Sequence, residues 1–125
     1  MISADPIIVI GKLQMMAQEL DDLSSKLVEI ERKLEPAEDA YEKFVDAYYE
    51  GLWIKHMRDG DKFPGEDMRI RLARRAMPVE VLGQYAGLVA SRKRLQARIA
   101  AVKASVSAQQ SILSCLKQEM EVSRG

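Results

Sequence analysis

Apolar residues recur along this chain in alternating steps of three and four, and they do so in two long series. The first series consists of Leu13, Met16, Leu20, Leu23, Leu27, Ile30, Leu34, Ala37, Tyr41, Phe44 and Tyr48. The second consists of Val81, Tyr85, Leu88, Arg92, Leu95, Ile99, Val102, Val106, Gln109, Leu113, Leu116 and Met120. Steps that average about 3.5 residues keep one stripe of a helix facing a partner along its whole length. The pattern predicts an all-α fold, a long antiparallel two-helix coiled-coil hairpin.

The two series also predict a register. If Tyr48 lies level with Tyr85, the following layers pair Tyr41 with Arg92, Met16 with Leu116 and Leu13 with Met120. Arg92 and Gln109 are the two polar members of the stripe. Polar residues at such positions commonly fix register at some cost in stability, so this is the favoured interpretation, and a ligand site is the alternative.

Helix signals divide the chain, as a single helical domain over 1–125, into three segments. Asp5 before Pro6 is a good helix start, so the first helix is expected over 6–55, with a kink or short break near Pro36. Breakers between 60 and 65 predict a loop, and with the charged segment after them they form a cap of loop and short helix over 56–77. The second long helix is expected over 78–122. The small helical cap therefore lies at the bend of the hairpin.

A hairpin of two helices has a thin core, so a third element or a second copy of the chain is expected to help. The predicted second helix carries small residues at heptad-like spacing that could form a self-association face. They include Ala97, Ala101, Ala104 and Ala108, and the stripe continues to Cys115. Alanine is also the best helix former, and this alternative leaves the choice between monomer and homodimer open.

The cysteine content and the hydropathy of the chain indicate where in the cell the protein is expected. Cys115 is the only cysteine, which excludes an internal disulfide and a thiolate metal site, and we expect it to be a small buried side chain. No apolar run is long enough to cross a bilayer, and the start MISADPIIVI lacks a basic leader. We therefore expect a cytoplasmic protein with no membrane contact.

Charge is balanced in total, with 19 basic and 19 acidic residues, but it is unevenly placed. Residues 1–50 hold 12 acidic and 5 basic side chains, whereas residues 51–78 hold 4 and 7, and residues 79–125 hold 3 and 7. Complementary charge on two paired helices is the simplest reading of this pattern. The basic excess at the cap suggests, in addition, a contact with a partner.

Every aromatic residue lies between 41 and 85, and basic residues are interleaved with them. The candidate residues for binding a partner or nucleic acid are Trp53, Lys55, Arg58, Lys62, Phe63, Arg69, Arg71, Arg74 and Arg75. This combination is typical of proteins that bind single-stranded DNA, because cations meet the phosphates and aromatic rings stack on the bases. The same residues could instead form a small core, and a net charge of zero argues against strong non-specific binding.

Catalysis finds little support in the sequence, and no cofactor or metal is expected. His56 and Cys115 would lie near opposite ends of the hairpin, which excludes a nucleophilic pair. A phosphate-binding glycine loop is absent, since Gly83 and Gly87 fall inside a predicted helix, where they are expected to mark close packing or a bend.

The segment from Tyr41 to Met120 resembles small coiled-coil proteins of tailed bacteriophages, encoded near genes for single-strand annealing or single-strand-binding proteins. The resemblance rests on AYEKFVDAYYEGL, DMRIRLARRA, RKRLQARI and SILSCLKQEM. It implies a phage origin, a place in DNA metabolism and the cytoplasm of an infected bacterium as location, but it transfers no activity to individual residues.

Three functional hypotheses follow. The first is a non-catalytic accessory protein whose cap contacts a recombination or replication protein, or single-stranded DNA. The second is an inhibitor of a host or defence protein that mimics DNA through acidic residues of the first helix, among them Glu38, Glu42 and Asp46. The third is a structural coiled coil of a virion or scaffold.

Overall fold

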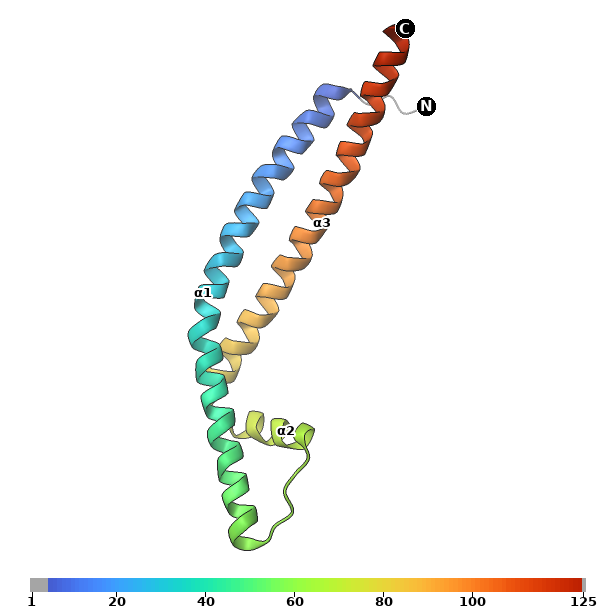
Figure 1. Cartoon of the computed structure of the whole chain (residues 1–125). Helices are drawn as coiled ribbons and strands as arrows, with labels where there is room; N and C mark the ends of the chain where they lie inside the picture. Colours follow the sequence, from blue (N-terminus) through green and yellow to red (C-terminus); the bar gives the residue numbers. More distant parts are fainter. Residues whose placement is uncertain (1–4, 125) are drawn as a thin grey trace. The chain divides into compact units, whose positions relative to one another are not determined.

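The computed structural model describes residues 5–124, and within that range the chain is all-α, as predicted (Figure 1). The helices are α1 (Pro6–Asp59), α2 (Glu66–Ala76) and α3 (Val79–Arg124). The chain folds into two compact units. Unit 1 combines residues 1–29 with residues 92–125, and unit 2 contains residues 30–91.

In unit 1 the first half of α1 lies antiparallel to the second half of α3. Glu19 accepts a hydrogen bond from Arg98 Nε at 2.9 Å, and Pro6 lies in a groove with Leu116. Pairing of early residues of one helix with late residues of the other defines the antiparallel direction. The buried core of this unit consists of Val9, Leu23 and Val102.

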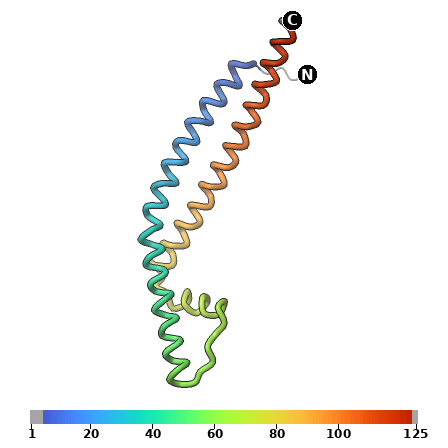
Figure 2. Tube along the Cα trace, viewed as in Figure 1, coloured from blue at the N-terminus to red at the C-terminus, as the bar shows by residue number. Residues whose placement is uncertain are grey.

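In unit 2 all three helices contribute to the packing. The ring of Tyr41 in α1 stacks on Tyr85 in α3, with a centroid distance of 4.2 Å. Ala73 of α2 is fully buried, and Met77 directly after α2 is buried as well. Figure 2 traces the loop of residues 60–65 that leads from α1 into α2. The third element expected from the thin core is therefore α2.

The two predicted stripes are the internal faces of the helices. All members of the first series are buried or half-buried. The same holds for the second series except Met120, which is 49% exposed near the end of α3. Apart from Met120, the alternating steps of three and four residues therefore identified the packing positions correctly.

The predicted register, in contrast, is wrong by about one heptad in unit 2. Tyr85 stacks on Tyr41, whereas the prediction placed it level with Tyr48. Within unit 1, Met16 lines a small cavity with Val102 and Ser105 and does not meet Leu116 there. A heptad slip keeps the same stripes in contact, so the stripe alone does not exclude it. The slip leaves the last turns of α1 to pack against the loop and α2.

Helix ends follow local signals. Asp5 Oδ1 accepts a hydrogen bond from the backbone N–H of Ile7 at 2.9 Å, so α1 begins at Pro6 with a side-chain cap, as predicted. Gly60 has φ of +72° and donates its N–H to the carbonyl of His56 at 3.0 Å. A glycine in the left-handed conformation is a common helix terminator, and it ends α1 at Asp59.

The sequence predicted a kink or a short break near Pro36, and α1 passes through Pro36 as one continuous helix, so the break is excluded. Pro36 removes one helical hydrogen bond and frees the carbonyl of Arg32. Both residues are exposed, so water can reach this part of the helix. Leu34 and Ala37 on the inner face are buried, and their packing holds the helix together across the proline.

Two smaller expectations, for Cys115 and for the close packing of Gly83 and Gly87, are also corrected. Cys115 is exposed rather than buried, because it lies beside the Leu116 stripe on the outer side of α3. A Cβ added at Gly83 or Gly87 would meet nothing within 4 Å, so these glycines do not mark close packing.

A candidate binding surface in unit 2

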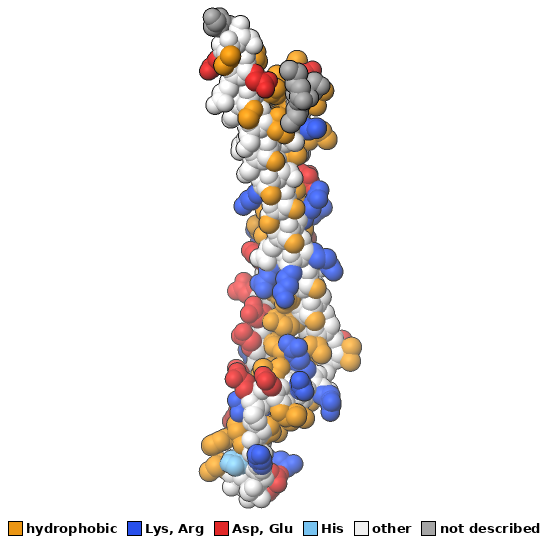
Figure 3. All heavy atoms as spheres, turned by 90° about the vertical axis from the view of Figure 1, so that its right-hand side faces the viewer, with side chains coloured by type: hydrophobic (Ala, Val, Ile, Leu, Met, Phe, Trp, Pro, Cys, Tyr) orange, Lys and Arg blue, Asp and Glu red, His pale blue; other side chains and the backbone are white. Residues whose placement is uncertain are grey.

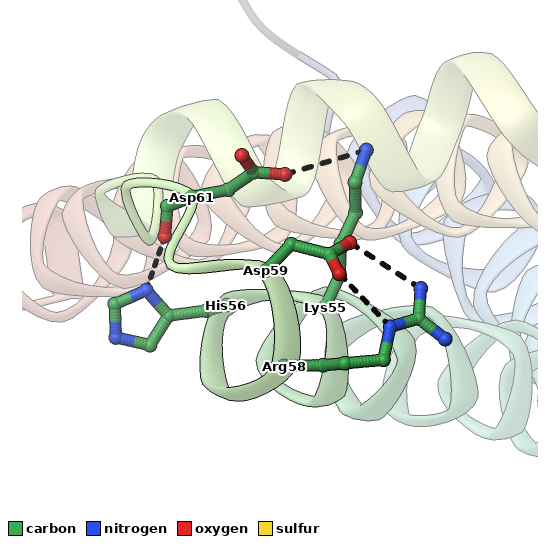
Figure 4. A network of polar contacts seen from close by, with 5 residues as sticks. All are labelled: Lys55, His56, Arg58, Asp59 and Asp61. Carbon is green, nitrogen blue, oxygen red and sulfur yellow. Dashed lines mark hydrogen bonds and ion pairs between the residues drawn. The ribbon is translucent and has the colours of Figure 1, made fainter.

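The aromatic residues at the end of α1 form a cluster around Phe63. Its ring meets Trp53 edge-on, with centroids 5.2 Å apart and planes at 89°. The ring centroid of His56 lies 5.9 Å from that of Phe63 and 5.5 Å from that of Trp53. His56 Nδ1 also contacts the carbonyl oxygen of Asp61, which holds the loop against the helix (Figure 4). The cluster thus fixes the loop, and Trp53 stays 50% exposed.

Arg69 is an internal residue of this unit. Its guanidinium carbon lies 4.7 Å from the ring centroid of Phe63 and 5.4 Å from that of Tyr49. Nη1 donates a hydrogen bond to the carbonyl of Pro64 at 3.1 Å, whereas Nε is buried with no hydrogen-bond partner. Cations over ring faces gain electrostatic stabilisation when they are desolvated. Arg69 therefore joins α2 to α1 and to the loop.

Two further predicted cations are paired with neighbouring carboxylates (Figure 4). Lys55 Nζ lies 3.6 Å from Asp61 Oδ2, and Arg58 makes a two-point contact with Asp59 at 3.0 and 3.3 Å. All four side chains are well exposed, so these pairs add little to stability. They do lower the positive potential that a phosphate would meet.

Arg74 also turns inward. Its Nε donates a hydrogen bond to the hydroxyl of Tyr41 at 3.0 Å, and that bond raises the pKa of the Arg74 guanidinium. Tyr41 stacks on Tyr85 as well, so the Tyr41 side chain connects α1 to both α2 and α3 within unit 2.

Lys62, Arg71 and Arg75 remain as exposed cations. Among residues 5–124, the structure gives none of the three an ion pair or hydrogen bond. Arg71 and Arg75 are one helical turn apart on α2, on the side opposite the fully buried Ala73. Figure 3 shows Lys and Arg side chains beside hydrophobic ones on one face of the molecule.

The last turns of α1 carry an apolar surface, of which the sequence predicted only Trp53 as a candidate binding residue. Trp53, Ile54 and Met57 are 50%, 52% and 66% exposed and share one side of the helix. We call these residues the Trp53 stripe. Their spacing gives a usable signal, because they follow Tyr48 but fall outside the continuing three-and-four series. Apolar residues outside the packing stripe are expected on the surface.

The acidic residues of the predicted DNA mimic and the alanines of the predicted self-association face also lie on helix surfaces. Glu42 and Asp46 are exposed and Glu38 is half-buried, in one row along α1 of unit 2. The alanines of the proposed self-association stripe, Ala97, Ala101, Ala104 and Ala108, are all exposed on α3 of unit 1. The roles proposed for both sets stay predictions.

Within residues 5–124, no three histidine, cysteine, aspartate or glutamate side chains are grouped to hold a metal ion. No helix in that range is both long and apolar enough to cross a membrane. No family model, curated protein or solved structure matches this chain.

Proposed function

We propose that this chain is a non-catalytic interaction protein that binds a protein partner through the Trp53 stripe. The observation that carries this proposal is the exposure of Trp53, Ile54 and Met57 side by side at the end of α1. Contiguous exposed apolar side chains, with a tryptophan among them, are typical of the buried centre of protein interfaces. Exposed Lys62, next to Phe63 in the loop, supplies a charged rim.

The intramolecular contacts favour a protein over a nucleic acid as the partner. Of the seven candidate cations, Lys55, Arg58, Arg69 and Arg74 are engaged within unit 2. A phosphate backbone is held by many free cations, whereas an apolar interface needs few.

The resemblance to phage coiled-coil proteins gives the proposal its context. We place the protein in the cytoplasm of a phage-infected bacterium, as an accessory factor in DNA recombination or replication. The partner class is then a single-strand annealing protein or a single-strand-binding protein. Binding there would recruit or modulate the partner without chemistry by this chain.

Trp53 is the only tryptophan, so its fluorescence reports on this surface alone. Titration with a purified annealing or single-strand-binding protein in which Trp residues are replaced by Phe should shift Trp53 emission to the blue and saturate. Met57→Glu should weaken binding at least tenfold, since a charge would enter the apolar centre.

Met15→Glu is the matched control, because Met15 is 75% exposed on α1 of unit 1. This variant should bind like the wild type. Equal loss in both variants, or no emission change with either class of partner, would reject the proposal.

Single-stranded DNA is a second candidate, favoured by half-exposed Trp53 together with unpaired Lys62, Arg71 and Arg75. Anisotropy of a labelled oligonucleotide at low and near-physiological salt tests it. Three phosphate contacts predict a slope of log K against log salt of about −2. Absence of binding at both salt concentrations excludes the strand and leaves the protein partner.

A further inference from the structure

Two helical faces of unit 2 carry opposite charges that the chain does not pair internally. The outer face of α2 presents Met68, which is 50% exposed, followed one and two turns later by Arg71 and Arg75. One side of α1 presents an acidic row, in which Glu42 and Asp46 are exposed and Glu38 is half-buried. Within residues 5–124, neither set makes a hydrogen bond or ion pair.

The geometry of α2 explains why these charges stay apart within one chain. Arg74 turns toward α1 and reaches Tyr41, whereas Ala73, fully buried, marks the face of α2 that packs inward. Arg71 and Arg75 lie on the opposite face, so they point away from the α1 of their own chain. A second molecule can approach that face.

The spacings of the two charged faces match. Arg71 and Arg75 are four residues apart, as are Glu42 and Asp46. Four residues of α-helix rise by about 6 Å, so two helices lying antiparallel can place Arg75 on Glu42 and Arg71 on Asp46 together. Met68, one turn before Arg71, supplies an apolar contact at the end of the charged row.

We propose that unit 2 forms a two-fold symmetric homodimer in which α2 of each copy lies on the acidic row of its partner. Because both faces belong to every copy, two-fold symmetry makes each contact twice. Opposite charges at an interface fix partner choice and orientation. This dimer is separate from the Trp53 stripe, so its presence does not depend on the proposed function.

Sedimentation equilibrium of the full chain tests the proposal. The wild type should show a mass of twice 14.1 kDa at high concentration and low salt, with dissociation as salt screens the charges. Arg71→Glu with Arg75→Glu should be monomeric, since α2 would face an acidic row. Glu42→Lys with Asp46→Lys should be monomeric for the opposite reason.

Mixing these two double variants is the decisive step. Each reciprocal contact in the mixture again joins an acidic and a basic face, so a heterodimer should form from two monomeric proteins. Lys103→Glu with Lys117→Glu is the control, because it changes net charge equally at exposed sites in unit 1 and should leave the wild-type dimer intact.

A wild type that stays monomeric at every concentration overturns the proposal. So does a dimer that survives both reversals, or a mixture that yields no heterodimer while circular dichroism shows both variants folded. Trp53 emission with the protein partner is measured separately on each variant. Loss of dimer and loss of partner binding are therefore distinguishable.

Discussion

Tyr41 is the residue through which the three helices of unit 2 are connected, by its stack on Tyr85 and its hydrogen bond from Arg74. Tyr41→Phe keeps the ring and removes the hydroxyl, so the free energy of unfolding should fall by about 0.5–1.5 kcal/mol. Thermal unfolding followed by circular dichroism measures this loss. Tyr48→Phe is the control, because among the described residues the Tyr48 hydroxyl has no hydrogen-bond partner. An equal change in both variants would contradict the role given to the Arg74 bond.

Replacing glycine by alanine should change the free energy of unfolding in opposite directions at different positions. Gly60→Ala places a side chain at φ of +72°, and it should destabilise the protein by about 1 kcal/mol. Gly83→Ala and Gly87→Ala lie inside α3 with open space around them, so each should stabilise by about 0.5–1 kcal/mol. Midpoints of thermal unfolding that fall for all three variants would show that Gly83 or Gly87 has a packing partner.

Side-chain burial was predictable from sequence where a residue belongs to a long periodic stripe. Leu23, Leu34 and Val102 are examples, since a position in a heptad is supported by its neighbours at three and four residues. Cys115 and Gly83 lie outside the stripe, and residue type alone wrongly suggested burial for Cys115 and close packing for Gly83. Burial follows position on the helix more closely than it follows residue type.

At the scale of the element, Pro36 tests how much packing contributes to the continuity of α1. Pro36→Ala restores one backbone hydrogen bond at an exposed site, so the free energy of unfolding should rise by about 1–3 kcal/mol. Ala40→Pro, one turn later and also exposed, should lower it by a similar amount or more. Chemical denaturation of both variants measures the two changes. A Pro36→Ala variant no more stable than the wild type would mean that the proline already costs nothing at this position.

The helices and their inner faces could be predicted, but the register of unit 2 could not. Tyr41 and Tyr48 occupy equivalent heptad positions, so either can meet Tyr85 without exposing the stripe. The choice depends on contacts outside the heptad, such as Trp53 with Phe63 and Arg69 with Tyr49. These contacts require the last turns of α1 to be free of α3, and no periodic signal encodes them.

At the scale of the whole molecule, the sequence could not show which of the candidate binding residues make internal contacts and which face outward. The candidate binding residues between Trp53 and Arg75 all lie in unit 2. Composition could not show that Arg69 and Arg74 act internally while Arg71 and Arg75 face outward, because that depends on how α2 is rotated against α1. The Trp53 stripe is likewise a consequence of where the packing of α1 changes from α3 to the loop.

Cys115 can decide which face is used for self-association. The alanine stripe on α3 continues to Cys115, whereas the proposed dimer uses α1 and α2 of unit 2. Exposed Cys115 should therefore react with a thiol reagent with the same second-order rate constant in dilute monomer and in concentrated dimer. The rate is read from the absorbance of the released thiolate, with the Arg71→Glu and Arg75→Glu double variant as the monomeric reference. A rate constant that falls as the wild type dimerises, and does not fall in that variant, would place Cys115 in the interface. Close approach of two α3 helices along Ala104 and Ala108 would then replace the contact between α2 and the acidic row.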